Sequence, residues 1–122
     1  MHIDRKQIQF NTIIRNIRIE QNYDLRDIFN NALSYQYNES ERPIIFKEND
    51  IKRFMVNSIR HNYSNYEDGL KQIHRLKMHE GIYFRYKNIV LNKISEMYPF
   101  LYDECKSQKH DVYMVDIIKP VN

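Results

Sequence analysis

Residues 81–97 read GIYFRYKNIVLNKISEM. Positions three and four residues apart share one face of an α-helix, and here that face is apolar, with Ile82, Tyr86, Ile89, Val90, Ile94 and Met97. Phe84 and Leu91 lie on the other side, and a helix that is apolar on two sides usually packs between neighbours. Gly81 permits a break before this helix, and Pro99 ends it. The stretch therefore predicts the central helix of a helical domain.

Helical spacing of apolar residues also recurs in the earlier part of the chain. The predicted helices are about Arg5 to Glu20, a second from a cap at Asn22 or Asp24 through Leu33, a third from a cap at Asn49 or Asp50 through Ile59, and a fourth after Ser64. The fourth helix is expected to bury Tyr66, Leu70, Ile73 and His74. A short last helix is expected after Pro99, through Leu101 and Cys105.

Two short segments favour β structure. Residues 112–118, Val-Tyr-Met-Val-Asp-Ile-Ile, alternate and are rich in β-branched side chains. Residues 44–46, Ile-Ile-Phe, are their natural partner, because an isolated strand leaves its backbone unpaired. We therefore predict a mainly α fold, one domain over residues 1–122, with five to six helices and a two-stranded β element. The open edge of residues 112–118 predicts a homodimer through this strand.

The composition excludes several classes of protein. The chain has 122 residues and a mean hydropathy of -0.75, and no apolar run is long enough for a membrane span or a secretory signal. The lone Cys105 cannot form an internal disulfide, which fits a reducing cytoplasm. Ile, Asn, Lys and Tyr, all with A/T-rich codons, dominate the chain, and this favours a low-GC bacterium, its phage or a plasmid as the source.

Positive charge is concentrated in the middle of the chain. Residues 52–93 hold 9 Lys and Arg against 3 Asp and Glu, whereas the net charge of the whole chain is +3. The same segment contains Tyr63, Tyr66, Tyr83 and Tyr86. Cations for phosphates and rings for bases are what nucleic acid binding requires. The alternative is that these Lys and Arg side chains only solvate the outer faces of helices.

No residue pattern indicates catalysis, a metal or a cofactor. His74 and His79 are five residues apart, which places them on different faces of a helix and prevents a shared metal. Cys105 is expected to be a buried structural residue rather than a nucleophile. Glu48, Asp50 and Lys52 are weakly similar to the carboxylates and lysine of a metal nuclease, but Asp50 is better explained as a helix cap.

The segment Ile59-Arg60-His61-Asn62-Tyr63-Ser64-Asn65-Tyr66-Glu67 joins the third and fourth predicted helices. Ser64 and Glu67 have the Ser-x-x-Glu form of a capping box, in which each side chain bonds the backbone amide of the other residue. Arg60 and His61 fall in the last turn of a helix, where its exposed carbonyls favour cations. One interpretation is a rigid corner in which Arg60 bonds carbonyls. The other is that Arg60 and His61 are presented to a partner.

This segment resembles the Arg-His-x-x-Thr-x-Tyr-Asp signature of a bacterial and fungal domain family of unknown function. Arg60, His61 and Tyr66 match the signature, and Ser64 and Glu67 are conservative departures from its Thr and Asp. In that family an Arg/Lys-rich helix follows, which here corresponds to Tyr83 onward. The resemblance covers about residues 52–93 and implies no activity, because the family has none assigned.

These patterns predict a binding protein without chemistry of its own. The leading hypothesis is a nucleic-acid-binding accessory or regulatory factor of a phage or mobile element. The alternative is an inhibitor or adaptor that binds an acidic surface of a host or phage nucleic-acid enzyme. The helix before the corner carries a stripe of Arg53, Asn57 and Arg60, and the helix after it carries a stripe of Lys71 and Arg75. These two stripes are expected to flank one groove. The predicted binding residues are Arg53, Asn57, Arg60, His61, Tyr63, Lys71, Arg75 and Arg85.

Overall fold

The predicted central helix forms in the computed structural model, which describes residues 5–21, 24–31 and 48–110. This helix is α5, Glu80–Met97, and its buried side chains are Ile82, Tyr86, Val90, Leu91 and Ile94. Its neighbours are α3 (Glu48–Asn62), α4 (Tyr66–Arg75), the 3₁₀ turn η1 (Pro99–Leu101) and α6 (Tyr102–Gln108). Leu91 is buried on the second apolar side, as predicted, whereas Phe84 on that side is 39% exposed.

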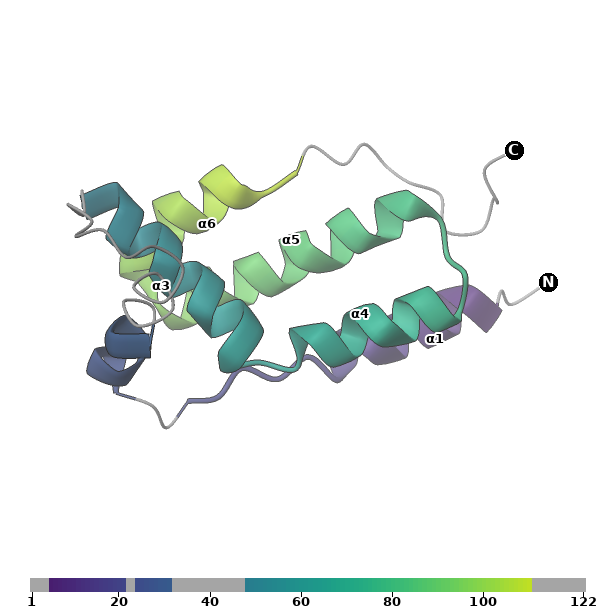
Figure 1. The fold of residues 1–122 in the computed structure, drawn as a ribbon. Coiled ribbons are helices and arrows are strands. Elements are labelled where there is room, and N and C mark those ends of the chain that lie inside the picture. The colour runs from purple at the N-terminus through teal and green to yellow at the C-terminus, as the bar shows by residue number, and fades with distance from the viewer. Residues whose placement is uncertain (1–4, 22–23, 32–47, 111–122) are drawn as a thin grey trace, which may run out of the picture.

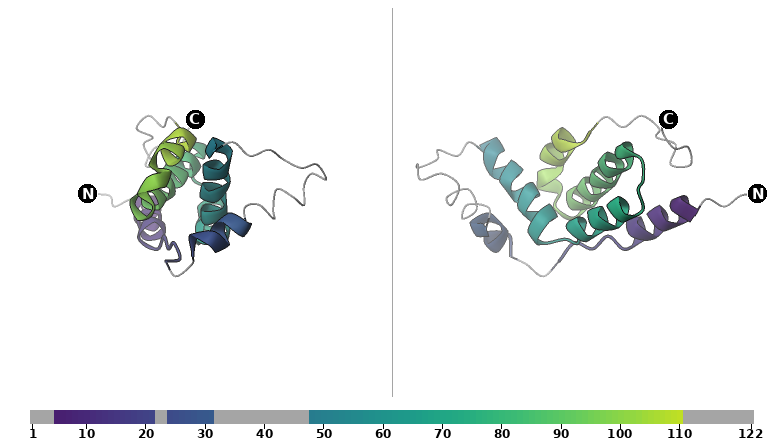
Figure 2. Two further views of the ribbon diagram at one scale, coloured as in Figure 1. Left: turned by 90° about the vertical axis from the view of Figure 1, so that its left-hand side faces the viewer. Right: turned by 45° about the vertical axis from the view of Figure 1, so that its right-hand side comes forward.

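The helices surround α5 in a simple arrangement (Figure 1). α4 and α5 run in opposite directions, and α3 crosses at the end where α4 begins. α1 (Arg5–Arg15) lies against α4, and α6 lies beside α5 and α3. Two further views show the same packing (Figure 2). The prediction of a mainly α fold is confirmed, and the described residues contain no β-strand.

α1 ends at Arg15, so the predicted helix to Glu20 is wrong in its last turn. The side chain of Asn65 is the reason. Its Oδ1 accepts a hydrogen bond from the Arg18 amide at 2.8 Å, and its Nδ2 donates to the Asn16 carbonyl at 2.7 Å. Ile19 then pairs with Ser64 in an isolated antiparallel bridge. These bonds take backbone groups that a longer helix would use.

The start of the second predicted helix is correct, and that of the third is not. Residues 25–31 are helical, and the carboxylate of Asp24 accepts a bond from the Arg26 amide at 3.1 Å, as a cap does. α3, however, already begins at Glu48, so Asn49 and Asp50 lie inside the helix rather than before it. Asp50 instead pairs with Arg53 at 2.9 Å, because residues three apart are neighbours on a helix surface.

The turn between α4 and α5 lies earlier than Gly81. Lys77 has a positive φ of 51°, which reverses the chain, and His79 caps α5 by accepting a bond from the Gly81 amide at 2.8 Å. The predicted break at Gly81 is therefore wrong. Tyr66 and Ile73 are buried as predicted, but His74 is exposed, with its Nδ1 3.4 Å from the Tyr83 hydroxyl.

The end of the described chain follows the prediction. Pro99 starts η1, and Leu101 and Cys105 are fully buried. The predicted strands at 44–46 and 112–118 lie outside the described residues, and so does the homodimer edge that depends on them. Among the helices that the structure describes, none has the length and apolar character needed to cross a bilayer.

Candidate functional site

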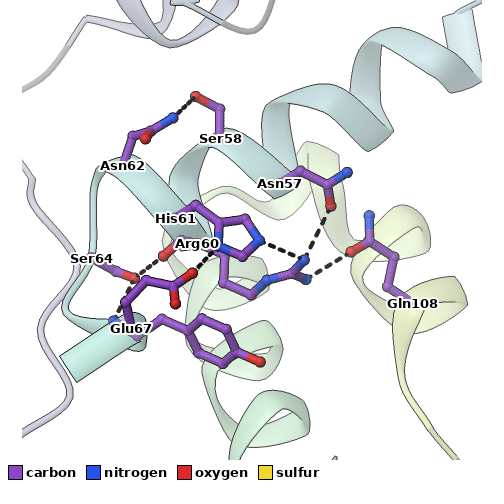
Figure 3. Close-up of polar contacts among 9 residues, drawn as sticks. Asn57, Ser58, Arg60, His61, Asn62, Ser64, Glu67 and Gln108 are labelled. Carbon is purple, nitrogen blue, oxygen red and sulfur yellow. Dashed lines mark hydrogen bonds and ion pairs between the residues drawn. The ribbon is translucent and has the colours of Figure 1, made fainter. Parts of the chain in front are cut away.

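Ser64 builds the corner between α3 and α4 with its hydroxyl. The Ser64 Oγ donates to the carbonyl of Arg60 in the last turn of α3, and it accepts from the Tyr66 amide, at 3.2 Å, where α4 begins (Figure 3). Both free helix ends thus gain a partner from one side chain. The helix cap position itself is Asn65, whose side chain is bonded to residues 16 and 18 rather than to α4.

Arg60 lies inside the corner and is only 7% exposed, so the prediction that it is presented on the surface is wrong. Its Nη1 donates to Gln108 Oε1 of α6 at 3.1 Å, and its Nη2 lies 3.4 Å from Asn57 Oδ1 (Figure 3). The guanidinium also lies over the ring of Tyr66, 5.4 Å from its centroid. The Nε atom is buried without a hydrogen-bond partner.

His61 connects Arg60 to Glu67. Arg60 Nη2 lies 3.2 Å from His61 Nε2, and the other ring nitrogen, Nδ1, bonds a Glu67 carboxylate oxygen (Figure 3). A guanidinium can only donate, so Nε2 accepts and Nδ1 donates. The predicted capping box is wrong in both halves, because Glu67 bonds His61 and the Ser64 hydroxyl accepts from the Tyr66 amide rather than from that of Glu67. His61 itself is exposed as predicted, with 44% of its side chain accessible.

The tyrosines of the basic segment belong mainly to the core. The exposed fraction is 4% for Tyr63, 6% for Tyr66 and 1% for Tyr86. The hydroxyl of Tyr63 accepts a hydrogen bond from the side-chain amide of Asn31. The rings of Tyr66 and Tyr86 stack at a centroid distance of 5.4 Å. These three rings cannot stack on bases, so the prediction that they contact nucleic acid is wrong. Tyr63 is a structural residue rather than a binding residue.

Burial sets the electrostatics of this region. Desolvation lowers the pKa of Arg60, against the opposing influence of Tyr66, Glu67 and Cys105. Desolvation also raises the pKa of Tyr66 and Tyr86. Burial raises the pKa of the Cys105 thiol to about 11, so its reactive thiolate form is disfavoured at neutral pH. Cys105 is therefore a buried structural residue, as the sequence predicts.

A groove of about 260 Å³ lies between α1 and α4. Its lining residues are Gln9, Thr12, Ile13, Gln72, Arg75 and Leu76. Arg75 and Lys71 are exposed on α4, one turn apart, as predicted. Arg15 of α1 is also exposed, and its Nη2 lies 3.4 Å from the hydroxyl of Thr12, which lines the groove. No carboxylate lines this groove, and α1 contains no acidic residue.

The predicted stripe on α3 does not continue this groove. Arg53 is exposed but paired with Asp50, Asn57 is half-buried, and Arg60 is buried. α3 and α4 also diverge from the corner (Figure 1), and Arg53 lies in the first half of α3 whereas Arg75 is the last residue of α4. Arg85 lies apart from both stripes and is exposed, with its guanidinium 5.6 Å from the centroid of the Phe10 ring of α1.

The contribution of α1 is absent from the sequence prediction. The available signal is local: α1 carries Arg5, Lys6 and Arg15 and no acidic residue. Residues 1–51 as a whole contain more acidic than basic side chains, and this average hides the basic helix. α1 contributes to the groove only because it packs on α4.

Comparisons with protein-family models, with curated proteins and with solved structures found no match to this chain. Within the described part of the chain, no group of three His, Cys, Asp or Glu side chains is placed to hold a metal ion. The candidate site therefore rests on the geometry of two regions, the groove between α1 and α4 and the buried corner at Arg60.

The role of Ser64 in the corner can be measured. Ser64→Ala removes the acceptor of the Tyr66 amide and the donor to the Arg60 carbonyl, so we expect the free energy of unfolding to fall by about 1–2 kcal/mol. Urea denaturation followed by circular dichroism measures the loss. Ser64→Thr keeps the hydroxyl and is the matched control, with a smaller loss. Equal stability of Ser64→Ala and the wild type would contradict this role.

Proposed function

We propose that the protein binds nucleic acid through the groove between α1 and α4, by contacts to phosphates rather than to bases. The observation that carries the proposal is the set of cations at this groove without a carboxylate among its lining residues. Arg75 lines the groove and Arg15 contacts the Thr12 hydroxyl of its lining, while Lys71 and Arg5 are exposed one turn from the lining residues Arg75 and Gln9.

The polar lining suits phosphate oxygens. Gln9 and Gln72 offer amide donors, Thr12 offers a hydroxyl, and Arg75 offers a forked guanidinium. Side chains of these types make the contacts to phosphates that position a protein on a nucleic acid without reading its sequence. Base stacking has little support here, because three of the four tyrosines of the basic segment are buried. We therefore expect binding with little sequence preference.

The size of the salt effect follows from the number of contacts. Contacts from four cations to a single strand give a slope of about −3 in a plot of log affinity against log salt. Raising salt from about 50 to about 200 mM then weakens binding roughly fiftyfold. Fluorescence anisotropy with labelled single- and double-stranded DNA and RNA measures both values.

A charge-reversal pair tests the location of the site. Lys71→Glu with Arg75→Glu is expected to abolish binding at about 200 mM salt and to lower the salt slope by about half at low salt, because two of the four contacts are lost. The control is Arg26→Glu with Lys106→Glu, which makes the same change in net charge at two exposed residues elsewhere. Circular dichroism establishes that both variants fold.

The outcomes separate the proposal from its alternatives. Equal loss of binding in the two charge-reversal pairs indicates attraction by net charge alone and contradicts a site in the groove. Loss of binding in Arg53→Glu moves the surface to α3. Absence of binding to every nucleic acid at low salt overturns the proposal and favours an acidic protein surface as the partner.

A further inference from the structure

A second group of basic side chains lies away from the groove, between α3, α5 and the end of α6. Its first member is Arg60, which is 93% buried and has no carboxylate within ion-pair distance among the described residues. The two nearest candidates are engaged elsewhere. Glu67 is bonded to His61, and Glu104 accepts a bond from Gln108 Nε2 at 3.0 Å. The side chains of His61 and Gln108 therefore lie between these carboxylates and Arg60.

The other members are Lys87 of α5 and His110, two residues beyond α6. Lys87 Nζ lies 3.2 Å from His110 Nε2. The side chain of Asn88 fixes the backbone of His110 with two hydrogen bonds. Its Nδ2 donates to the His110 carbonyl at 2.8 Å, and its Oδ1 accepts from the His110 backbone amide at 2.9 Å. The His110 ring also packs against Phe84, with 4.4 Å between centroids. The imidazole is therefore held in place beside the lysine.

Arg60 is joined to the same end of α6 through Gln108, two residues before His110. The pKa of Lys87 is lowered by desolvation and by the charge of Arg60. The pKa of His110 is lowered by desolvation and by the charges of Lys87 and Arg60. Among the described residues, no carboxylate affects the pKa of Lys87 or of His110. The charge of Glu67 does raise the pKa of Arg60, but desolvation outweighs it.

Arg60 also keeps an unused donor. Its Nη atoms are directed to side-chain acceptors, but its Nε–H is buried without an acceptor. Leaving a buried donor unsatisfied costs about 1–3 kcal/mol, and more when the group is charged. An anion held by these residues would accept this hydrogen bond and would offset the repulsion between the charges of Arg60 and Lys87.

We propose that Arg60, Lys87 and His110 form a binding site for a phosphate group. A guanidinium, an ammonium and an imidazole together offer donors in several directions, which matches a tetrahedral oxyanion better than a planar carboxylate. The site is separate from the groove of the proposed function, because none of its residues lines that groove. The phosphate can be free or belong to a nucleotide or to the end of a nucleic acid strand.

Thermal unfolding in inorganic phosphate tests the site. Sodium phosphate is compared with sodium chloride at equal ionic strength and at pH 6.5. A saturable rise in Tm of about 5 °C is expected when phosphate exceeds its dissociation constant tenfold. Lys87→Met and, separately, His110→Gln are expected to remove this rise. Lys93→Met is the matched control, because Lys93 lies on the same helix, outside the cluster, and is also half-buried.

The behaviour of Lys87→Met in chloride provides a second readout. Because the ammonium is repelled by Arg60 in the folded protein, its loss is expected to leave the Tm equal to that of the wild type or to raise it. NMR provides a measurement that needs no variant, since phosphate should shift the signals of the Asn88 side-chain amide and the His110 ring. A Tm rise that is no larger in phosphate than in chloride, or one that persists in Lys87→Met, overturns the proposal.

A comparison of ligands identifies the molecule that supplies the phosphate group. Inorganic phosphate, a nucleoside 5′-monophosphate, and one oligonucleotide with and without a 5′-phosphate are compared in the same assay. Tighter binding that requires the 5′-phosphate and is lost in Lys87→Met assigns the site to strand ends. A phosphate response that is lost in Lys71→Glu with Arg75→Glu but kept in Lys87→Met would place the phosphate in the groove and contradict this proposal. Failure of nucleic acid binding leaves the inorganic phosphate test unaffected.

Discussion

Gly69→Ala is expected to lower the free energy of unfolding by about 2 kcal/mol or more, although alanine is the better helix former. Gly69 lies within α4, where the exchange alone would stabilise the helix by about 1 kcal/mol. A Cβ atom at this position, however, would lie 1.9 Å from the Tyr86 hydroxyl oxygen and 2.4 Å from its Cζ. Overlap of this kind forces a shift in the core, and the steric cost exceeds the gain.

The ring of Tyr86 has little freedom to move. It is 1% exposed and stacks against Tyr66, with an angle of 3° between the ring planes. A shift of Tyr86 would therefore disturb Tyr66, which lies below the guanidinium of Arg60. Urea denaturation of Gly69→Ala measures the loss, and a reduced m-value would show that the native packing has loosened.

A double-mutant cycle provides the control. Tyr86→Leu removes the hydroxyl and the ring, so Gly69→Ala in that background is expected to cost much less, or to stabilise the protein through helix propensity. An equal cost of Gly69→Ala in both backgrounds would show that the contact with Tyr86 is not the cause.

Apolar periodicity was sufficient to predict most helices, because helical packing of a small domain requires one apolar face for each helix. The helix ends were less predictable, since distant residues decide some of them. Asn65 bonds Asn16 and Arg18, and no pattern within residues 5–20 indicates this competition. Likewise, Asp50 is a good cap by composition, but it lies inside α3 and pairs with Arg53.

The same reason explains the errors at the candidate site. Arg60 is buried because Gln108, 48 residues later, supplies an acceptor, and a local pattern cannot contain this contact. Tyr66 and Tyr86 lie on apolar faces that predict burial, and this evidence outweighs their position within a basic segment. By contrast, Lys71 and Arg75 were correctly predicted to be exposed, because one turn of a polar helix face is a local property.

Two substitutions of Arg60 separate its size from its charge. Arg60→Ala is expected to lower the free energy of unfolding by about 3 kcal/mol, because it leaves a cavity beside Tyr66 and removes the donor of Gln108 Oε1. Arg60→Met keeps most of the volume and removes only the charge and its hydrogen bonds. Urea denaturation at pH 7 measures the stability of both variants.

Arg60→Met is expected to cost far less than Arg60→Ala and can be more stable than the wild type. Burial lowers the pKa of Arg60, so the folded state holds its charge less favourably than the unfolded state. The guanidinium is protonated in both states at pH 7, and folding therefore carries this desolvation cost, which the charge of Glu67 offsets only in part. Replacing such buried charges with apolar side chains of similar volume is often neutral or stabilising.

A stable Arg60→Met variant that has lost its Tm response to phosphate would show that the charge serves binding rather than folding. A loss of stability as large as that of Arg60→Ala would instead mean that the hydrogen bonds to Gln108 and Asn57 hold the corner together, and Arg60 would then be a structural residue.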